Sequence, residues 1–219
     1  LFPAGALPAL LATLARVPDD VAMVGPVTNA AGNGQCLRLH AVPMAQVPGI
    51  GAAAMRSVTG LLTPTYRSDF FCIAVRRAAW QELGGLAPEF GLGYYEDFDF
   101  SLRLAKRGYG QVVAEDVFVA HVGSASFAAM GAAQKTLMRK NRALLIERGL
   151  VTDGAVETME KEIQEHLNQE LERAEKSPMP TNRAISNPKT LMDATPRSFI
   201  ILSPAAIVRS LIIPEKAIK

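Results

Sequence analysis

Apolar positions recur with helical spacing in several segments of the chain. In residues 3–16 this spacing predicts one amphipathic helix, whose buried face would carry Leu7, Leu10, Leu11 and Leu14. Residues 76–83, 96–107 and 137–148 also have helical patterns, and a glycine follows each of them. Because glycine readily adopts the left-handed conformation that ends helices, these glycines predict where the helices end.

Strand patterns alternate with these helices. The run 21–24 is short and apolar and ends at Gly25-Pro26, while residues 111–122 alternate toward His121 at their far end. The run 70–75 (Phe-Phe-Cys-Ile-Ala-Val) is the clearest strand pattern, and residues 41–65 are predicted to be irregular because they are rich in proline and glycine. Strands alternating with helices predict an α/β layered domain over residues 1–150.

The rest of the chain reads as an extension in three parts. Residues 151–175 begin with a Thr-Asp cap and predict an amphipathic helix, and residues 176–198, rich in Pro, Ser, Asn and Thr, predict a linker or disordered segment. Residues 199–219 are apolar but interrupted by Ser, Pro and Arg. A membrane span needs about 20 mostly apolar residues. This segment therefore predicts either a packed helix or a peripheral contact with a membrane surface.

Composition limits the classes of function. The 219 residues are 49% hydrophobic and 20% charged, with a net charge of +2, which fits one sizeable domain with an appendage. No basic stripe interleaved with aromatics is present, so we expect no nucleic-acid partner. Cys36 and Cys72 match no disulfide or metal framework and predict buried, reduced thiols of a cytosolic protein. Because residue 1 is Leu and the first residues read like the middle of a domain, we expect a fragment that lacks its N-terminal part.

The segment 91–103 concentrates the candidate chemistry. Glu96 and Asp97 fall in the first turn of a predicted helix, where the helix dipole stabilises carboxylates, and Asp99 can pair with Arg103 one turn on. Two interpretations are open from the spacing. The carboxylates either form a solvated acidic helix start, or they include a general base behind a glycine-aromatic loop that gates a substrate. His121, at a strand end beside a polar loop, is either structural or a metal ligand.

Five elements in order resemble family 2 glycosyltransferases of the GT-A fold, in particular bacterial rhamnosyl-, galactofuranosyl- and O-antigen-type enzymes. They are Val24-Gly25-Pro26 with Thr28-Asn29, the step from Phe71 to Gly85, the pattern Gly-x-x-Glu-Asp-x-Asp-x-x-x-Arg, the Gly108-Tyr109 strand ending at His121 near Ser124, and Asn141-Arg142 through Gly149. The resemblance covers residues 1–150. It implies a partial GT-A fold, a Rossmann-like mixed sheet flanked by helices, whose nucleotide-binding part is missing.

The resemblance also implies roles for individual residues. Asp97 would be the general base and Glu96 its acceptor-orienting neighbour, with Asp99 and Arg103 as a structural brace. We assign the acceptor loop to Gly93, Tyr94, Tyr95 and Asn29. His121 would complete a site for Mn²⁺ or Mg²⁺, whose other ligands would lie in the missing part, because Asp97-Phe98-Asp99 belongs to the acceptor-side motif and not to the metal-binding Asp-x-Asp motif.

The implied activity is metal-dependent transfer of a sugar, with inversion, from a nucleotide-sugar to a glycan or lipid-linked glycan acceptor. It would serve cell-surface polysaccharide or glycan synthesis in the cytoplasm or at the inner face of the membrane, and the fragment alone would be inactive. The alternative is a non-catalytic module of the same fold that binds a glycan or a protein. An acidic cation-binding domain fits less well, because the carboxylates lack the regular ligand spacing of an EF-hand.

Overall fold

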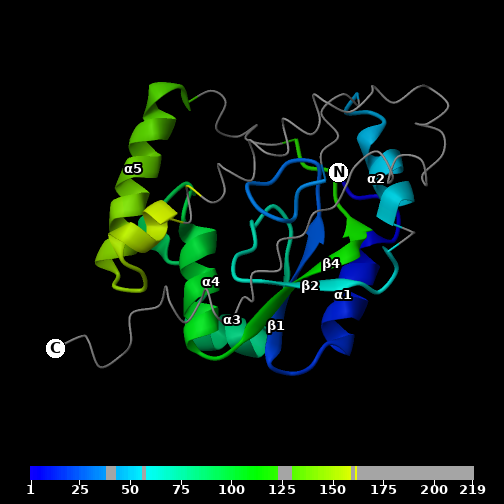
Figure 1. Ribbon diagram of the computed structural model, residues 1–219, viewed down its shortest axis with the longest axis horizontal. Coiled ribbons are helices and arrows are strands. Elements are labelled where there is room, and N and C mark those ends of the chain that lie inside the picture. The colour runs from blue at the N-terminus through cyan, green and yellow to red at the C-terminus, as the bar shows by residue number, and fades with distance from the viewer. Residues whose placement is uncertain (38–42, 56–57, 123–129, 159–160, 162–219) are drawn as a thin grey trace.

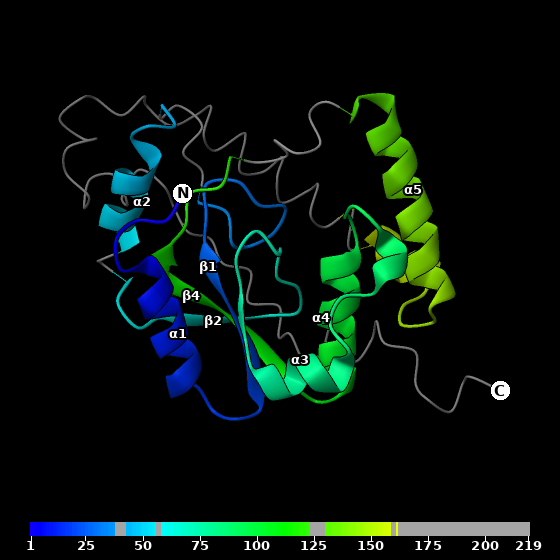
Figure 2. The same ribbon diagram turned by 180° about the vertical axis from the view of Figure 1, so that it is seen from behind.

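The computed structural model describes residues 1–37, 43–55, 58–122, 130–158 and 161, and these form an α/β domain built on a four-stranded mixed sheet (Figures 1 and 2). The strands are β1 (Val21–Val27), β2 (Leu62–Thr65), β3 (Ala74–Val75) and β4 (Gly110–Phe118). The helices are α1 (Ala6–Arg16), α2 (Val47–Met55), α3 (Arg77–Leu83), α4 (Glu96–Lys106) and α5 (Ala132–Glu147), with a short 3₁₀ helix η2 (Pro88–Phe90). The predicted α/β class is confirmed.

The sheet has the strand order β2-β4-β1-β3. β1 runs parallel to β4, with Val24 opposite Val112, while β3 and β2 add antiparallel strands at the two edges. The central pair is buried along nearly its whole length. Strands covered on both faces read as continuous apolar runs, which is why β1 lacks an alternating pattern.

Helices cover both faces of this sheet. Along β1, Val24 joins the core formed with Leu10 and Leu14 of α1, whereas its neighbour Met23 joins the core formed with Phe100 of α4. Successive side chains of a strand point to opposite faces, so α1 and α4 lie on opposite sides of the sheet. Both views place α5 beside α4, on the side away from the strands (Figures 1 and 2).

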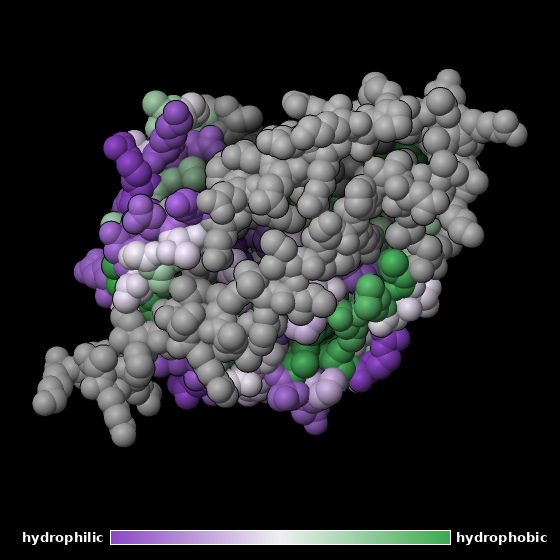
Figure 3. Space-filling model, viewed as in Figure 1, coloured by the Kyte–Doolittle hydropathy of each residue, from purple (hydrophilic) through white to green (hydrophobic). Residues whose placement is uncertain are grey.

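The predicted buried face of the first helix is half right. Leu10 and Leu14 are buried, but Leu7 and Leu11 are 50% and 53% exposed. The face of α1 that packs on the sheet is narrower than the four leucines predict, so Leu7 and Leu11 remain on the surface. The space-filling view shows apolar surface over α1 and hydrophilic surface over α5 (Figure 3).

Two predicted segments need correction. Of the strand predicted at 70–75, only Ala74–Val75 pairs in the sheet, because the preceding aromatics pack elsewhere: Phe70 packs edge-on against Phe100, and Phe71 stacks on His121. The region 41–65, predicted to be irregular, contains α2 and β2. Pro48 is compatible with α2 because it occupies the first turn, where the backbone N–H has no partner in the helix.

The C-terminal part of the described chain extends the α4–α5 layer. α5 begins at Ala132, earlier than predicted, and Leu145 packs in one core with Leu102 of α4. The Thr152 hydroxyl accepts the Ala155 N–H at 3.2 Å, which confirms the predicted cap. Most of the predicted helix 151–175 and all of 176–198 and 199–219 lie outside the described residues. No helix in the described part is both long and apolar enough to cross a membrane.

Cys36 and Cys72 form no disulfide bond. Both residues are of intermediate burial, so the predicted burial of the two thiols is only partial. Burial raises the pKa of the Cys72 thiol above its ordinary value, which keeps the group protonated at neutral pH.

Candidate functional site

The loop before α4 has an unusual backbone. Tyr94 and Tyr95 have φ angles of 68° and 71°, the left-handed region that residues with a side chain rarely occupy. Gly93 before them also has a positive φ. Such backbone persists only where surrounding contacts hold it, and it concentrates at functional sites.

Asn141 of α5 stabilises this loop through hydrogen bonds. Its buried Nδ2 group donates to the carbonyls of Phe90 at 2.8 Å, Gly93 at 2.7 Å and Tyr94 at 3.1 Å. Gln134, also on α5, donates to the Tyr94 hydroxyl. The loop is therefore fixed by α5 and in turn fixes the first turn of α4, since the Tyr95 carbonyl accepts the Asp99 N–H at 2.9 Å. The sequence motif indicates the loop, whereas the role of the Asn141 side chain in ordering it is visible only in the fold.

The first turn of α4 carries the two candidate catalytic carboxylates. The Asp97 Oδ1 atom accepts the Phe98 N–H at 2.7 Å, which fixes the orientation of this carboxyl. The Glu96 Oε2 atom is buried and has no hydrogen-bond partner among the described residues. A buried carboxylate oxygen without a partner is costly, and an incoming hydroxyl group would satisfy it.

The Asp97 carboxyl has a strongly perturbed pKa. Burial raises this pKa from 3.8 to about 6, with Asp69 and Glu96 adding to the increase, while the charge of Arg67 and the Phe98 N–H act against it. A carboxyl with a pKa near 6 is ionised at neutral pH and is more basic than an ordinary aspartate. Asp97 is thus suited to accept a proton, as the general-base interpretation requires.

Arg67 and Asp69, between β2 and β3, are close enough for their charges to act on this carboxyl. The Arg67 Nη2 atom lies 3.1 Å from Asp69 Oδ1, and the guanidinium carbon lies 5.5 Å from the centre of the Phe98 ring. Burial lowers the pKa of Arg67, but the charges of Asp69 and Asp97 outweigh it and leave that pKa above its ordinary value. Neither residue was among the predicted site residues, since no pattern in the local sequence links them to α4.

The brace formed by Asp99 and Arg103 is present and larger than predicted. Arg103 Nε and Arg148 Nε each lie 2.7 Å from one oxygen of the fully buried Asp99 carboxylate. Arg103 also donates to the carbonyls of Leu83 at 2.7 Å and Gly85 at 2.8 Å. The buried carboxylate therefore ties α4 to the end of α3 and to the end of α5.

Asn29 and His121 form a second group. The Asn29 amide donates to the His121 carbonyl at 2.9 Å, and its oxygen accepts the His121 N–H at 2.8 Å. Asn29 thus holds the chain at His121 and makes no hydrogen bond to the loop of Gly93, Tyr94 and Tyr95 within the described residues. Both polar atoms of its side chain contact the backbone of His121, and its place among the acceptor-side residues stays a prediction.

The His121 ring is oriented for a ligand on one side. Its Nδ1 atom lies 2.9 Å from the Ala30 carbonyl, which can only accept, so Nδ1 carries a proton and Nε2 keeps its lone pair in the neutral ring. A carbonyl partner on the far nitrogen is typical of metal-bound histidines. However, no group of three or more metal-ligating His, Cys, Asp or Glu side chains gathers in the described part of the chain. His121 fits as one ligand, and the complete metal site stays a prediction.

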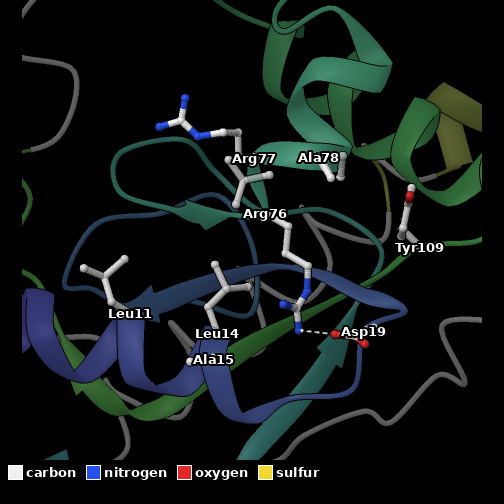
Figure 4. A pocket seen from close by; sticks show the side chains of 10 residues that line it. Leu11, Leu14, Ala15, Asp19, Arg76, Arg77, Ala78 and Tyr109 are labelled. Carbon is white, nitrogen blue, oxygen red and sulfur yellow. Dashed lines mark ion pairs between the residues drawn. The ribbon is translucent and has the colours of Figure 1, made fainter.

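A surface hollow between α1 and α3 lies apart from these residues (Figure 4). Arg76 lines it and donates to the carbonyls of Val21 at 3.0 Å, Val17 at 2.9 Å and Pro18 at 3.2 Å, besides pairing with Asp19 at 3.6 Å. Its guanidinium is committed to the connection between α1 and β1. We therefore place the candidate site at the start of α4 and not in this hollow.

Comparisons of the chain with models of protein families, with curated proteins and with solved structures found no match.

Proposed function

We propose that this chain is the acceptor side of an inverting glycosyltransferase, in which Asp97 deprotonates the acceptor hydroxyl. The observation that carries the proposal is the carboxyl of Asp97, a residue of intermediate burial, whose pKa is raised by burial to about 6 and which follows a loop of left-handed backbone held by α5. Groups whose pKa values are shifted from the ordinary range concentrate at functional sites, and so do residues with strained backbone. The mixed α/β sheet is compatible with a partial GT-A fold.

In the proposed reaction the acceptor oxygen attacks the anomeric carbon of a nucleotide-sugar as the bond to the diphosphate breaks. The hydroxyl proton passes to Asp97, and the nucleoside diphosphate leaves with the electrons of the broken bond. Glu96 would accept a hydrogen bond from the acceptor through its otherwise unpartnered Oε2 atom. The loop of Gly93, Tyr94 and Tyr95 would cover the acceptor and exclude water.

A divalent cation, Mn²⁺ or Mg²⁺, would offset the negative charge of the departing diphosphate when bound. The described residue that would hold it is His121, through Nε2. The remaining partners follow from the resemblance: a nucleotide-sugar donor and a glycan or lipid-linked glycan acceptor, with action in the cytoplasm or at the inner face of the membrane.

The proposal is tested with the full-length gene product, nucleotide-sugars and Mn²⁺ or Mg²⁺. We expect Asp97→Asn to lower kcat by about 10²- to 10⁴-fold, the usual contribution of a general base. In the unsubstituted protein kcat/KM should rise with pH through about 6 and then level off, because the base acts only when ionised. The matched control is Asp153→Asn at an exposed carboxylate, which should leave kcat unchanged.

Full activity of the Asp97→Asn variant would overturn the assignment of the base. Calorimetry separates the proposal from the alternative binding module: metal-dependent binding of a nucleotide supports the transferase, whereas glycan binding without any nucleotide binding supports the module.

A further inference from the structure

We infer that Arg67 is a positioning residue for Asp97: it supplies a fixed positive charge at the first turn of α4, and Asp69 holds it there. The inference rests on the function proposed for Asp97 and adds a residue that neither the motif nor the helix start contains. Its basis is a set of hydrogen bonds that ties the segment 65–69 to the loop after β1.

The position of Arg67 is set from two sides. On one side its guanidinium pairs with Asp69 at 3.1 Å, and on the other it lies 5.5 Å from the ring of Phe98, the residue that follows Asp97. Both charged side chains are mostly buried, with 23% and 17% exposed. A guanidinium held by a carboxylate and an aromatic face has few alternative rotamers, so its charge stays beside α4.

Asp69 is itself anchored. Its carboxylate accepts the Gly32 N–H at 2.8 Å and the Asn33 side-chain amide at 3.1 Å. Its backbone N–H donates to Gln35 Oε1 at 2.8 Å, and Gln35, which is fully buried, donates to the Pro26 carbonyl at 2.9 Å. The contacts that run from β1 through Gln35 and Asp69 to Arg67 thus join buried or partly buried groups, and they support one charge.

The charges around Asp97 show what this support does. Asp69 and Glu96 both disfavour ionisation of Asp97, as does burial, which is the largest influence. Within the described residues, Arg67 is the cation that acts on this carboxyl in the opposite direction. Without Arg67, the pKa of Asp97 would rise further, and less of the base would be ionised at neutral pH.

The test measures ionisation of Asp97 without using activity. A carboxyl whose pKa is higher in the folded state than in the unfolded state makes the fold less stable as pH rises between the two values. Relative to Asp97→Asn, the parent should therefore lose unfolding free energy as pH rises from 3.8 to about 6, and the difference between the two proteins should then level off. Removing a neighbouring opposite charge raises a carboxyl pKa by about 1 unit or more.

In the background of Arg67→Met we expect the levelling-off point to move upward by about 1 pH unit. Arg67→Lys, which keeps the charge but loses the planar contacts, should shift it less. Arg77→Met removes an exposed arginine elsewhere and should leave the point near pH 6. If Arg67→Met does not fold, Arg67→Gln and Arg67→Lys provide the comparison. A levelling-off point that stays where it was in the folded Arg67 variants overturns the inference.

Activity provides the second readout. In the full-length gene product, the acidic limb of the kcat/KM profile should move upward by the same amount in Arg67→Met, whereas a merely structural role would lower kcat/KM at all pH values without moving the limb. If no sugar transfer is found but the pH at which the stability difference levels off still shifts, the proposed function is rejected and the electrostatic effect of Arg67 on Asp97 stands. Transfer that depends on Asp97 with an unmoved limb would reject the role of Arg67.

Discussion

Arg148 Nε lies 2.7 Å from Asp99 Oδ1, although 49 positions separate the two residues in the chain. The contact joins the end of α5 to the first turns of α4. It completes a buried carboxylate with a guanidinium on each oxygen, since Arg103 occupies the other. The candidate base Asp97 therefore lies on a helix that is held by the ion pairs of Asp99, and it follows a loop that is held by Asn141.

We expect Asp99→Asn to lower the free energy of unfolding by about 3 kcal/mol, because breaking a buried ion pair leaves its partners uncompensated. The asparagine amide would also point donor groups at one of the two arginines. Urea denaturation measures the effect. The matched control is Asp153→Asn, whose partner is Arg142 and whose side chain is 69% exposed. A surface pair of this kind is worth about 1 kcal/mol or less, so an equal loss in both variants would contradict the role assigned to Asp99.

Asn141→Leu removes the donor shared by the carbonyls of Phe90, Gly93 and Tyr94 while nearly preserving side-chain volume. We expect a loss of about 2 kcal/mol or more in unfolding free energy, since unsatisfied buried carbonyls cost about 1–3 kcal/mol. The loop should also exchange its amide hydrogens faster, because the left-handed backbone at Tyr94 and Tyr95 loses its support. Hydrogen exchange compared with Thr136→Ala, an exposed position on the same helix, checks this; unchanged loop exchange would refute it.

The sequence predicted what depends on neighbouring positions. The start of α4, the glycines that end α3 and α4, and the pair of Asp99 with Arg103 all follow from spacings of one helical turn. Arg148 and Arg67 reach α4 from distant segments, and only the fold brings them there. The carboxylate cluster could thus be found from its motif, whereas the groups that set its pKa and position could not.

The errors have the same origin. The strand predicted at 70–75 is short because Phe71 stacks on His121, a contact between residues 50 positions apart by their numbering. The helix α2 was missed because prolines and glycines normally interrupt helices. Packing of α2 against β4 outweighs this effect: Val47 and Met55 share a core with Phe118, and Gly51 lies close to the Phe118 ring.

That close approach gives a prediction with its own control on the same helix. A Cβ atom added at Gly51 would overlap the Phe118 ring, so Gly51→Ala forces α2 away from β4. We expect this overpacking to lower the free energy of unfolding by about 1–3 kcal/mol. Gly49 lies two positions earlier and has no atom within 4 Å of an added Cβ. Gly49→Ala should instead stabilise the protein by about 0.5–1 kcal/mol, since alanine is the better helix former. Thermal denaturation of both variants tests this. A lower Tm for Gly51→Ala with a higher Tm for Gly49→Ala supports close packing of α2 against β4 at Gly51, and Tm changes of the same sign exclude it.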